Sequence, residues 1–249
     1  MNSTWFRRFG DAPEGAPRLV LFPHAGGAAS TFVPLSRALA GRVDVLAVQY
    51  PGRQDRRLES PFESITGHAD ALAREIRPLT AAPYAFFGHS MGAVLAYETT
   101  RRLLATGSPA PCRLFLSGRG APSPRPGVHD RLDGDDAVIA AVRRLGGTGN
   151  AVLDDPELLE MVLPALRADY GALGSYSWAE GAPLPVPVTA LIGDADPVVP
   201  VARAAAWEEH TTGDFDLRVF PGGHFFLDDH TADIAALLSA NLSASGARA

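Results

Sequence analysis

The fold of this chain is decided at Tyr84-Ala85-Phe86-Phe87-Gly88-His89-Ser90-Met91-Gly92. Here an apolar run ends at a sharp turn, and a helical pattern follows from Met91 to Ala105. A strand, a turn and a helix in this order form a nucleophile elbow, which holds one serine in a strained backbone at a helix N-terminus. Glycine stands two positions before and two after Ser90, where a Cβ atom would collide with the strand or the helix. The stretch therefore predicts a nucleophile at Ser90; the alternative is a serine that only caps the helix.

A reactive serine needs a base, and the base needs an acid that orients it. Residues 188–192 are an apolar run that predicts a buried strand. Asp194 and Asp196 follow at its C-terminal end, where α/β sheets place their chemistry. The residue directly after Gly193 should turn away as the strand ends. We therefore expect Asp196, which precedes Pro197, to be the acid.

The base is expected at His224, which follows a predicted last strand over residues 215–220 and a Pro-Gly-Gly turn. The alternative for His224 is a turn histidine whose ring binds the backbone. The other histidines suit packing or surface roles better, because they lie near the elbow, in helical patterns, in a Pro- and Gly-rich stretch or beside the last helix. They are His24, His89, His68, His210, His129 and His230. The order Ser90, Asp196, His224 along the chain is that of the α/β-hydrolases.

An oxyanion hole is expected at the loop His24-Ala25-Gly26-Gly27, which follows a short apolar strand predicted over residues 19–22. The loop resembles the glycine-bearing oxyanion loops of lipases and esterases. One N–H donor must come from this loop and one from the residue after the nucleophile, so we expect the backbone N–H groups of Ala25 and Met91. A flexible turn or a phosphate cradle is the alternative, but no lysine follows and the G-x-G-x-x-G spacing is missing.

Five segments together resemble the type II thioesterases, the free-standing editing enzymes that accompany polyketide and nonribosomal peptide synthases. The segments are Leu21-Phe22-Pro23-His24-Ala25-Gly26-Gly27, Gln49-Tyr50-Pro51-Gly52-Arg53, Phe87-Gly88-His89-Ser90-Met91-Gly92, Gly193-Asp194-Ala195-Asp196-Pro197 and Gly222-Gly223-His224-Phe225-Phe226. The resemblance implies a triad of Ser90, Asp196 and His224 that needs no cofactor and no metal. It also implies a substrate: an acyl group held as a thioester on the phosphopantetheine of an acyl or peptidyl carrier protein.

The pattern of apolar runs predicts one α/β domain with a mostly parallel twisted sheet and helices on both faces. The order of the triad and the resemblance imply that this is a single α/β-hydrolase domain over residues 1–249. Residues 123–183 are expected to be a helical lid insertion. One lid helix is predicted over 135–145 with a stop at Gly146-Gly147, and another begins near residue 155 and should be kinked or divided at Pro164. Most apolar lid side chains should pack onto the core. A few are expected to line an acyl channel, and the candidates are Met161, Leu166 and Tyr170. The strands are expected at residues 5–9, 19–22, 43–48, 84–87, 112–117, 188–192 and 215–220.

Composition is that of an ordinary soluble globular protein, with 46% hydrophobic and 20% charged residues. The net charge of −6 gives no support to nucleic-acid binding. No apolar run approaches the length of a membrane span, and residues 1–10 lack the apolar core of a signal peptide. The single cysteine, Cys112, allows no internal disulfide. We expect a cytoplasmic protein with no membrane partner.

Carrier proteins present an acidic helix beside the phosphopantetheine, so Arg53, Arg56 and Arg57 are candidates for a docking rim. The alternative is that these arginines form an ordinary solvated face. The same triad also suits a small-molecule carboxylesterase, a perhydrolase or an acyltransferase, because the fold does not specify the leaving group. A hydrolase-fold binding protein without activity is a further alternative, and the presence of all three triad residues argues against it.

Overall fold

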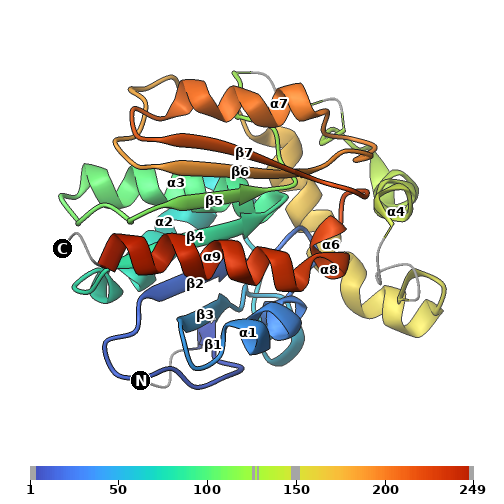
Figure 1. Cartoon of the computed structure of the whole chain (residues 1–249). Helices are drawn as coiled ribbons and strands as arrows, with labels where there is room; N and C mark the ends of the chain where they lie inside the picture. Colours follow the sequence, from blue (N-terminus) through green and yellow to red (C-terminus); the bar gives the residue numbers. More distant parts are fainter. Residues whose placement is uncertain (1–3, 125–126, 128, 147–151, 247–249) are drawn as a thin grey trace.

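The computed structural model describes residues 4–124, 127, 129–146 and 152–246. Residues 125–126, 128 and 147–151, which belong to the predicted lid and include Gly147 of the predicted helix stop, lie outside the described residues. The described part forms a seven-stranded sheet in the order β1-β3-β2-β4-β5-β6-β7 (Figure 1). Only the β1–β3 pair is antiparallel within this sheet, so the predicted mostly parallel α/β-hydrolase architecture is confirmed. The strands are β1 (Phe6–Arg7), β2 (Arg18–Phe22), β3 (Asp44–Val48), β4 (Tyr84–His89), β5 (Leu114–Ser117), β6 (Val188–Gly193) and β7 (Phe215–Phe220).

Helices cover both faces of the sheet because the central strands are apolar on both sides. On β4, Tyr84 and Phe86 belong to one buried cluster and Ala85 and Phe87 to the other, as the two-residue period of a strand requires. The first cluster contains side chains of α2 and α3, and the second contains side chains of α1 and α9. The two pairs of helices lie on opposite faces of the sheet (Figure 1). The helices are α1 (Val33–Leu39), α2 (Ile65–Ile76), α3 (Met91–Ala105), α4 (Gly134–Leu145), α6 (Pro156–Ser175), α7 (Val201–Ala205), α8 (Phe226–Asp229) and α9 (Thr231–Gly246).

Helices α4 and α6 lie in the chain between β5 and β6, where the lid was predicted. Helix α6 begins where Asp155 Oδ1 accepts hydrogen bonds from the next N–H groups, and Pro156 takes the first helical position. The helix is not divided at Pro164 but continues to Ser175. Its apolar face packs against Val138 of α4, and this packing outweighs the backbone hydrogen bond that proline removes. The role of residues 123–183 as a lid stays a prediction.

Some predicted strand ends were wrong. The strand expected over residues 5–9 is reduced to two residues, and the strand expected from residue 112 begins at Leu114. Cys112 and Arg113 are only half-buried, so the apolar run alone overestimated the strand. In contrast, β4 continues beyond Phe87 to His89, directly before the elbow serine.

Helix α3 starts in direct backbone contact with the end of β2. A Cβ atom added to Gly92 would lie 1.9 Å from the carbonyl oxygen of Phe22. A Cβ atom added to Gly88 would lie 2.2 Å from the carbonyl oxygen of Gly92. Both distances are far below any van der Waals contact, so glycine is required at both positions for the strand and the helix to approach in this way.

We expect Gly92→Ala to destabilise the protein by about 3 kcal/mol or more, because backbone atoms of β2 or α3 must move to accommodate one methyl group. The matched control is Gly171→Ala inside α6, where an added Cβ would have no atom within 4 Å apart from the backbone of its own helix. That change should stabilise the helix by up to about 1 kcal/mol. Urea unfolding of both variants measures the difference, and equal effects would contradict the steric explanation.

Candidate active site

Ser90 occupies the turn between β4 and α3 with φ 55° and ψ −116°. A non-glycine residue in this conformation is strained, and such strain persists only where the surroundings hold it. The Ser90 N–H donates to the carbonyl oxygen of Ser117 at the end of β5, with a distance of 2.8 Å. The turn thus places the Ser90 hydroxyl at the first turn of α3, as expected for a nucleophile elbow.

His224 and Asp196 are paired through a hydrogen bond of 2.7 Å between His224 Nδ1 and Asp196 Oδ2. The other carboxylate oxygen, Oδ1, accepts from the N–H groups of Val198 (2.9 Å) and Val199 (3.0 Å). Both side chains are almost fully buried, so the carboxylate is held in one orientation and directs one nitrogen of the imidazole. His224 Nε2 has no hydrogen-bond partner among the described residues, Ser90 included. Hydrogen bonds of this kind are often long in unliganded sites and tighten when substrate binds.

Asp194 has a different role from Asp196. Its Oδ1 accepts from the N–H of Gly222, with a distance of 2.9 Å, and its own N–H donates to the carbonyl oxygen of Phe220. Asp194 therefore ties the end of β6 to the loop that carries His224. Of the two aspartates expected from the sequence as candidates, only Asp196 contacts the imidazole.

Ser90, His224 and Ala25 line two cavities with volumes of about 440 and 970 Å³. Ala25 lies in the loop after β2, within which the N–H of Gly27 donates to the carbonyl oxygen of His24 at 2.9 Å. Met91 is the first residue of α3, and N–H groups in a first helical turn lack partners within the helix. The geometry is therefore compatible with N–H donors at Ala25 and Met91, and their role as an oxyanion hole stays a prediction.

The three side chains expected to line an acyl channel differ in position. Tyr170 lines both cavities, and Met161 lines the larger one although 65% of it is exposed. Leu166 lines neither cavity but is buried against Gly26, where an added Cβ would lie 2.4 Å from Leu166 Cδ2. The expectation for Leu166 was wrong because this side chain packs on the glycine loop.

Two further histidines, His24 and His89, surround the base. The ring centroids of His89 and His224 are 5.0 Å apart, and the ring of Phe225 lies within 5.5 Å of all three imidazoles. Burial, followed by the nearby His224 and Arg53, lowers the pKa of His24 to about 4. Burial likewise lowers the pKa of His89 well below its ordinary value, with His224 and His24 contributing. Both rings are therefore neutral at pH 7. Sequence reasoning excluded them as the base but did not predict this cluster.

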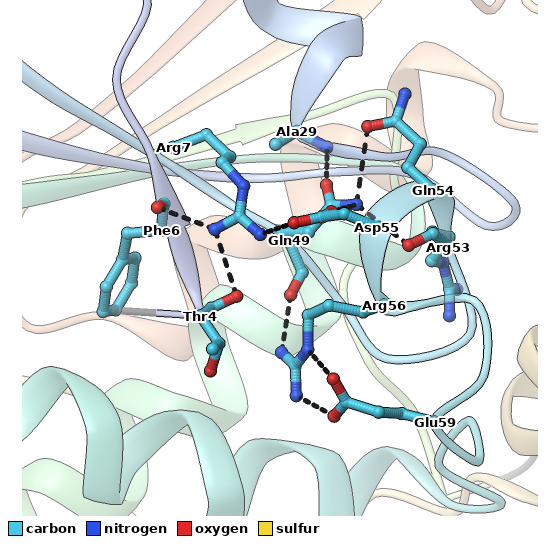
Figure 2. A network of polar contacts seen from close by, with 10 residues as sticks. All are labelled: Thr4, Phe6, Arg7, Ala29, Gln49, Arg53, Gln54, Asp55, Arg56 and Glu59. Carbon is cyan, nitrogen blue, oxygen red and sulfur yellow. Dashed lines mark hydrogen bonds and ion pairs between the residues drawn. The ribbon is translucent and has the colours of Figure 1, made fainter. Parts of the chain in front are cut away.

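The structure contradicts the prediction that Arg53 and Arg56 belong to an exposed docking rim, because only 5% and 6% of them are exposed. Figure 2 shows that Arg56 donates to the carbonyl oxygen of Gln49 and to both carboxylate oxygens of Glu59. Its guanidinium also lies 4.3 Å from the ring centroid of Trp5. These contacts replace the water that a buried guanidinium loses.

Arg53 forms a buried ion pair with Asp169 of α6. Nothing in the sequence pointed to Asp169. Burial raises the pKa of this carboxyl group above its ordinary value, and Arg53 and the N–H of Gly26 offset only part of the increase. Of the three arginines, Arg57 is exposed, and it lines the larger cavity. A docking role for Arg57 stays a prediction.

Within the described ranges, no cluster of three or more histidine, cysteine or acidic side chains has the arrangement of a metal site. None of the helices in this part of the chain is long and apolar enough to span a membrane.

Known proteins resemble the chain over nearly its whole length. Residues 17–242 match the family model of the thioesterase domain, and every predicted site residue lies in this range. Thioesterase PikA5 from Streptomyces venezuelae is 47% identical over 97% of this chain and 86% of its own length. A probable cadicidin biosynthesis thioesterase from Streptomyces griseus is 46% identical over 91% of this chain, which spans only 62% of that relative. Among solved structures, the type II thioesterase BorB from the borrelidin biosynthetic cluster has a TM-score of 0.89 and 44% identity, with 97% of this chain and 99% of BorB covered.

The pKa of His24 predicts a pH dependence of stability. Between pH 6.5 and about 4 the unfolded chain binds a proton at His24 and the folded chain does not, so the free energy of unfolding falls as the pH falls through this window. The contribution of His24 is up to about 3 kcal/mol. Urea unfolding from pH 7 to 4 should show a shallower loss of stability in His24→Gln than in the wild type. The exposed His129, replaced by Gln, is the control, and identical slopes for His24→Gln and the wild type would contradict the prediction.

Proposed function

Because the chain belongs to the thioesterase domain family, we propose that it is a serine thioesterase that releases acyl groups from the phosphopantetheine thioester of a carrier protein. The observation that carries this proposal is that three segments meet where two cavities adjoin: the Ser90 elbow, the loop at Ala25, and His224 with its partner Asp196. An alcohol, an oriented imidazole and backbone donors are the parts that acyl transfer needs.

In the proposed mechanism, His224 acts as general base. Its Nδ1–H donates to Asp196, which leaves Nε2 unprotonated and able to take the proton from Ser90 Oγ as this oxygen attacks the acyl carbonyl. The N–H groups of Ala25 and Met91 then hold the oxyanion that forms. His224 returns the proton to the departing sulfur. In the second half-reaction a water molecule, activated by the same imidazole, attacks the acyl-enzyme and releases the carboxylic acid.

A thioester suits this site because its leaving group is stable. The conjugate acid of an alkyl thiolate has a pKa of about 8.5, so a thiolate departs with little assistance, whereas an alkoxide from an oxygen ester requires fuller protonation. No organic cofactor or metal enters any of these steps. The chemistry is carried by the side chains of Ser90 and His224 with Asp196 as the orienting group.

The substrate is proposed to be bound to a synthase of polyketides or nonribosomal peptides, where the enzyme would remove unproductive acyl groups. The similarity to PikA5 and to the type II thioesterase BorB supports this editing role. The larger cavity, of about 970 Å³, has Met161 and Tyr170 on its wall and the exposed Arg57 beside it. We assign the acyl chain or its pantetheine arm to this cavity, and Arg57 to contact with an acidic carrier protein. A cytoplasmic location fits such a partner.

Intact-mass analysis of a carrier protein loaded with several acyl groups tests this function. Wild-type protein should remove the acyl mass, and Ser90→Ala should be slower by about a million-fold, because the nucleophile and its partners act as a unit. Faster cleavage of a matched oxygen ester than of the thioester would instead support a carboxylesterase. Transfer of the acyl group to a second molecule would indicate an acyltransferase, and no turnover at all would indicate a binding protein.

Asp196→Asn should lower kcat by about 10,000-fold, because an amide no longer stabilises the imidazolium or fixes the tautomer of His224. Asp194→Asn is the matched control two residues away, since its amide oxygen still accepts from the N–H of Gly222. Steady-state kinetics on one acyl thioester compares the two variants. A larger loss in Asp194→Asn would reverse the assignment of the acid.

A further inference from the structure

Asp169 is a buried carboxylate that joins α6 to the glycine loop. Only 3% of this residue is exposed, although it lies on α6, a helix of the predicted lid. Its Oδ2 accepts from the N–H of Gly26, with a distance of 2.7 Å, and the same oxygen pairs with Arg53. A desolvated carboxylate that accepts a charge-assisted hydrogen bond holds its donor more firmly than a neutral acceptor does. Asp169 thus fixes the peptide plane between Ala25 and Gly26.

Arg53 links Asp169 to the segment that follows β3. Its Nε donates to the carbonyl oxygen of Gly27 at 3.2 Å, and one terminal nitrogen donates to the carbonyl oxygen of Pro51 at 2.7 Å. The carbonyl oxygen of Arg53 in turn accepts from Gln49 Nε2 at 3.1 Å (Figure 2). The guanidinium therefore bridges the segment after β3 and the glycine loop.

Gln49 holds the segment that carries Arg53 in place through several hydrogen bonds. Its Oε1 accepts from the N–H of Ala29 at 2.9 Å, and its Nε2 also donates to Asp55, which pairs with Arg7 of β1 (Figure 2). These groups come from the segments around β1, β2 and β3. The pair of Arg53 and Asp169 is thus supported by the sheet edge at one end and by α6 at the other.

Helix α6 contacts the loop at a second point on the same face. Leu166 lies three residues before Asp169, which is one turn of helix, and its Cδ2 occupies the space beside Gly26. Gly26 has φ +74°, a conformation that glycine adopts without a steric penalty but that it does not hold by itself. The loop conformation therefore depends on α6 being seated against it.

We propose that Asp169 and Arg53 are positioning residues of the reaction: they hold the loop so that the N–H of Ala25 is aimed at the oxyanion only while α6 is seated. This inference rests on the proposed function. Neither residue contacts the reacting atoms, and both act through the backbone of residues 25–27. The lid helix and the oxyanion hole are then coupled, so that a substrate which displaces α6 also weakens stabilisation of the oxyanion.

The test separates this role from simple stabilisation of the fold by replacing the pair with apolar side chains. Arg53→Met and Asp169→Leu each leave one buried charge without its partner, and both single variants should be less stable than the wild type. The double variant should recover much of that stability, because no unpaired charge remains. It still lacks the acceptor for the N–H of Gly26. We expect its kcat on a small acyl thioester to fall about 100-fold, the loss that a displacement of about 1 Å can cause.

The KM of the double variant should change by less than about threefold, since only an interaction of the transition state is lost. The pH profile of kcat should keep its position, because the Asp196–His224 pair is untouched. Recovery of both stability and kcat in the double variant would overturn the inference. The thioesterase function itself is tested separately, by comparing the wild type with Ser90→Ala. If the wild type is active and Ser90→Ala is not, the proposed function holds even when the positioning role of Asp169 and Arg53 fails.

Two further variants keep the test decisive if the double variant does not fold. Asp169→Asn retains an oxygen for the N–H of Gly26 and should keep a higher kcat than Asp169→Ala, and equal losses would overturn the inference. Asp135→Asn, a change on α4, breaks the exposed ion pair between Asp135 and Arg167 of α6. It should have wild-type kinetics, because exposed ion pairs contribute little. A loss equal to that of Asp169→Ala would show that the loss of any ion pair to α6 has this effect, and it would overturn the inference.

Discussion

The start of α3 packs directly against the end of β2, backbone to backbone, so that no side-chain atom fits between them. The position of the nucleophile depends on this contact. It forces the sharp turn in which Ser90 has a positive φ, and it brings the loop that follows β2 beside the serine. The strained turn is held from the other side by the bond from the Ser90 N–H to Ser117. Packing around the elbow therefore sustains a conformation that the serine alone would not adopt.

The electrostatics in direct contact with the base depend on one carboxylate and two neutral imidazoles. Asp196 is held by three hydrogen-bond donors and provides the negative charge in contact with His224. Burial keeps His24 and His89 neutral at pH 7, so neither ring repels the imidazolium that forms at His224 during acyl transfer. A charged histidine at 5 Å in this buried environment would work against the base.

The arginines after β3 illustrate how the fold assigns a different role to a charged segment. A run with Arg53, Arg56 and Arg57 is typical of a solvated or docking surface, and only Arg57 has that exposure. Arg53 pairs with Asp169, which is 116 positions further along the chain. Local sequence contains no signal for such a partner, because the pairing depends on how α6 packs against the glycine loop. The proposed coupling of α6 to the oxyanion loop has the same origin.

The amino-acid sequence by itself determined the parts that depend on short-range sterics and periodicity. These include the elbow at Ser90, the alternation of β4 between two cores, and the sequence order of nucleophile, acid and base. The preference for Asp196 over Asp194 also came from a local feature, the turn that ends β6. Only the tertiary structure decided the rest: the neutral imidazoles around His224, the continuation of α6 through proline, and the burial of Arg53 against Asp169. The physical reason is that a backbone turn is set by its own few residues, whereas burial, pKa and ion pairing depend on atoms that distant segments bring together.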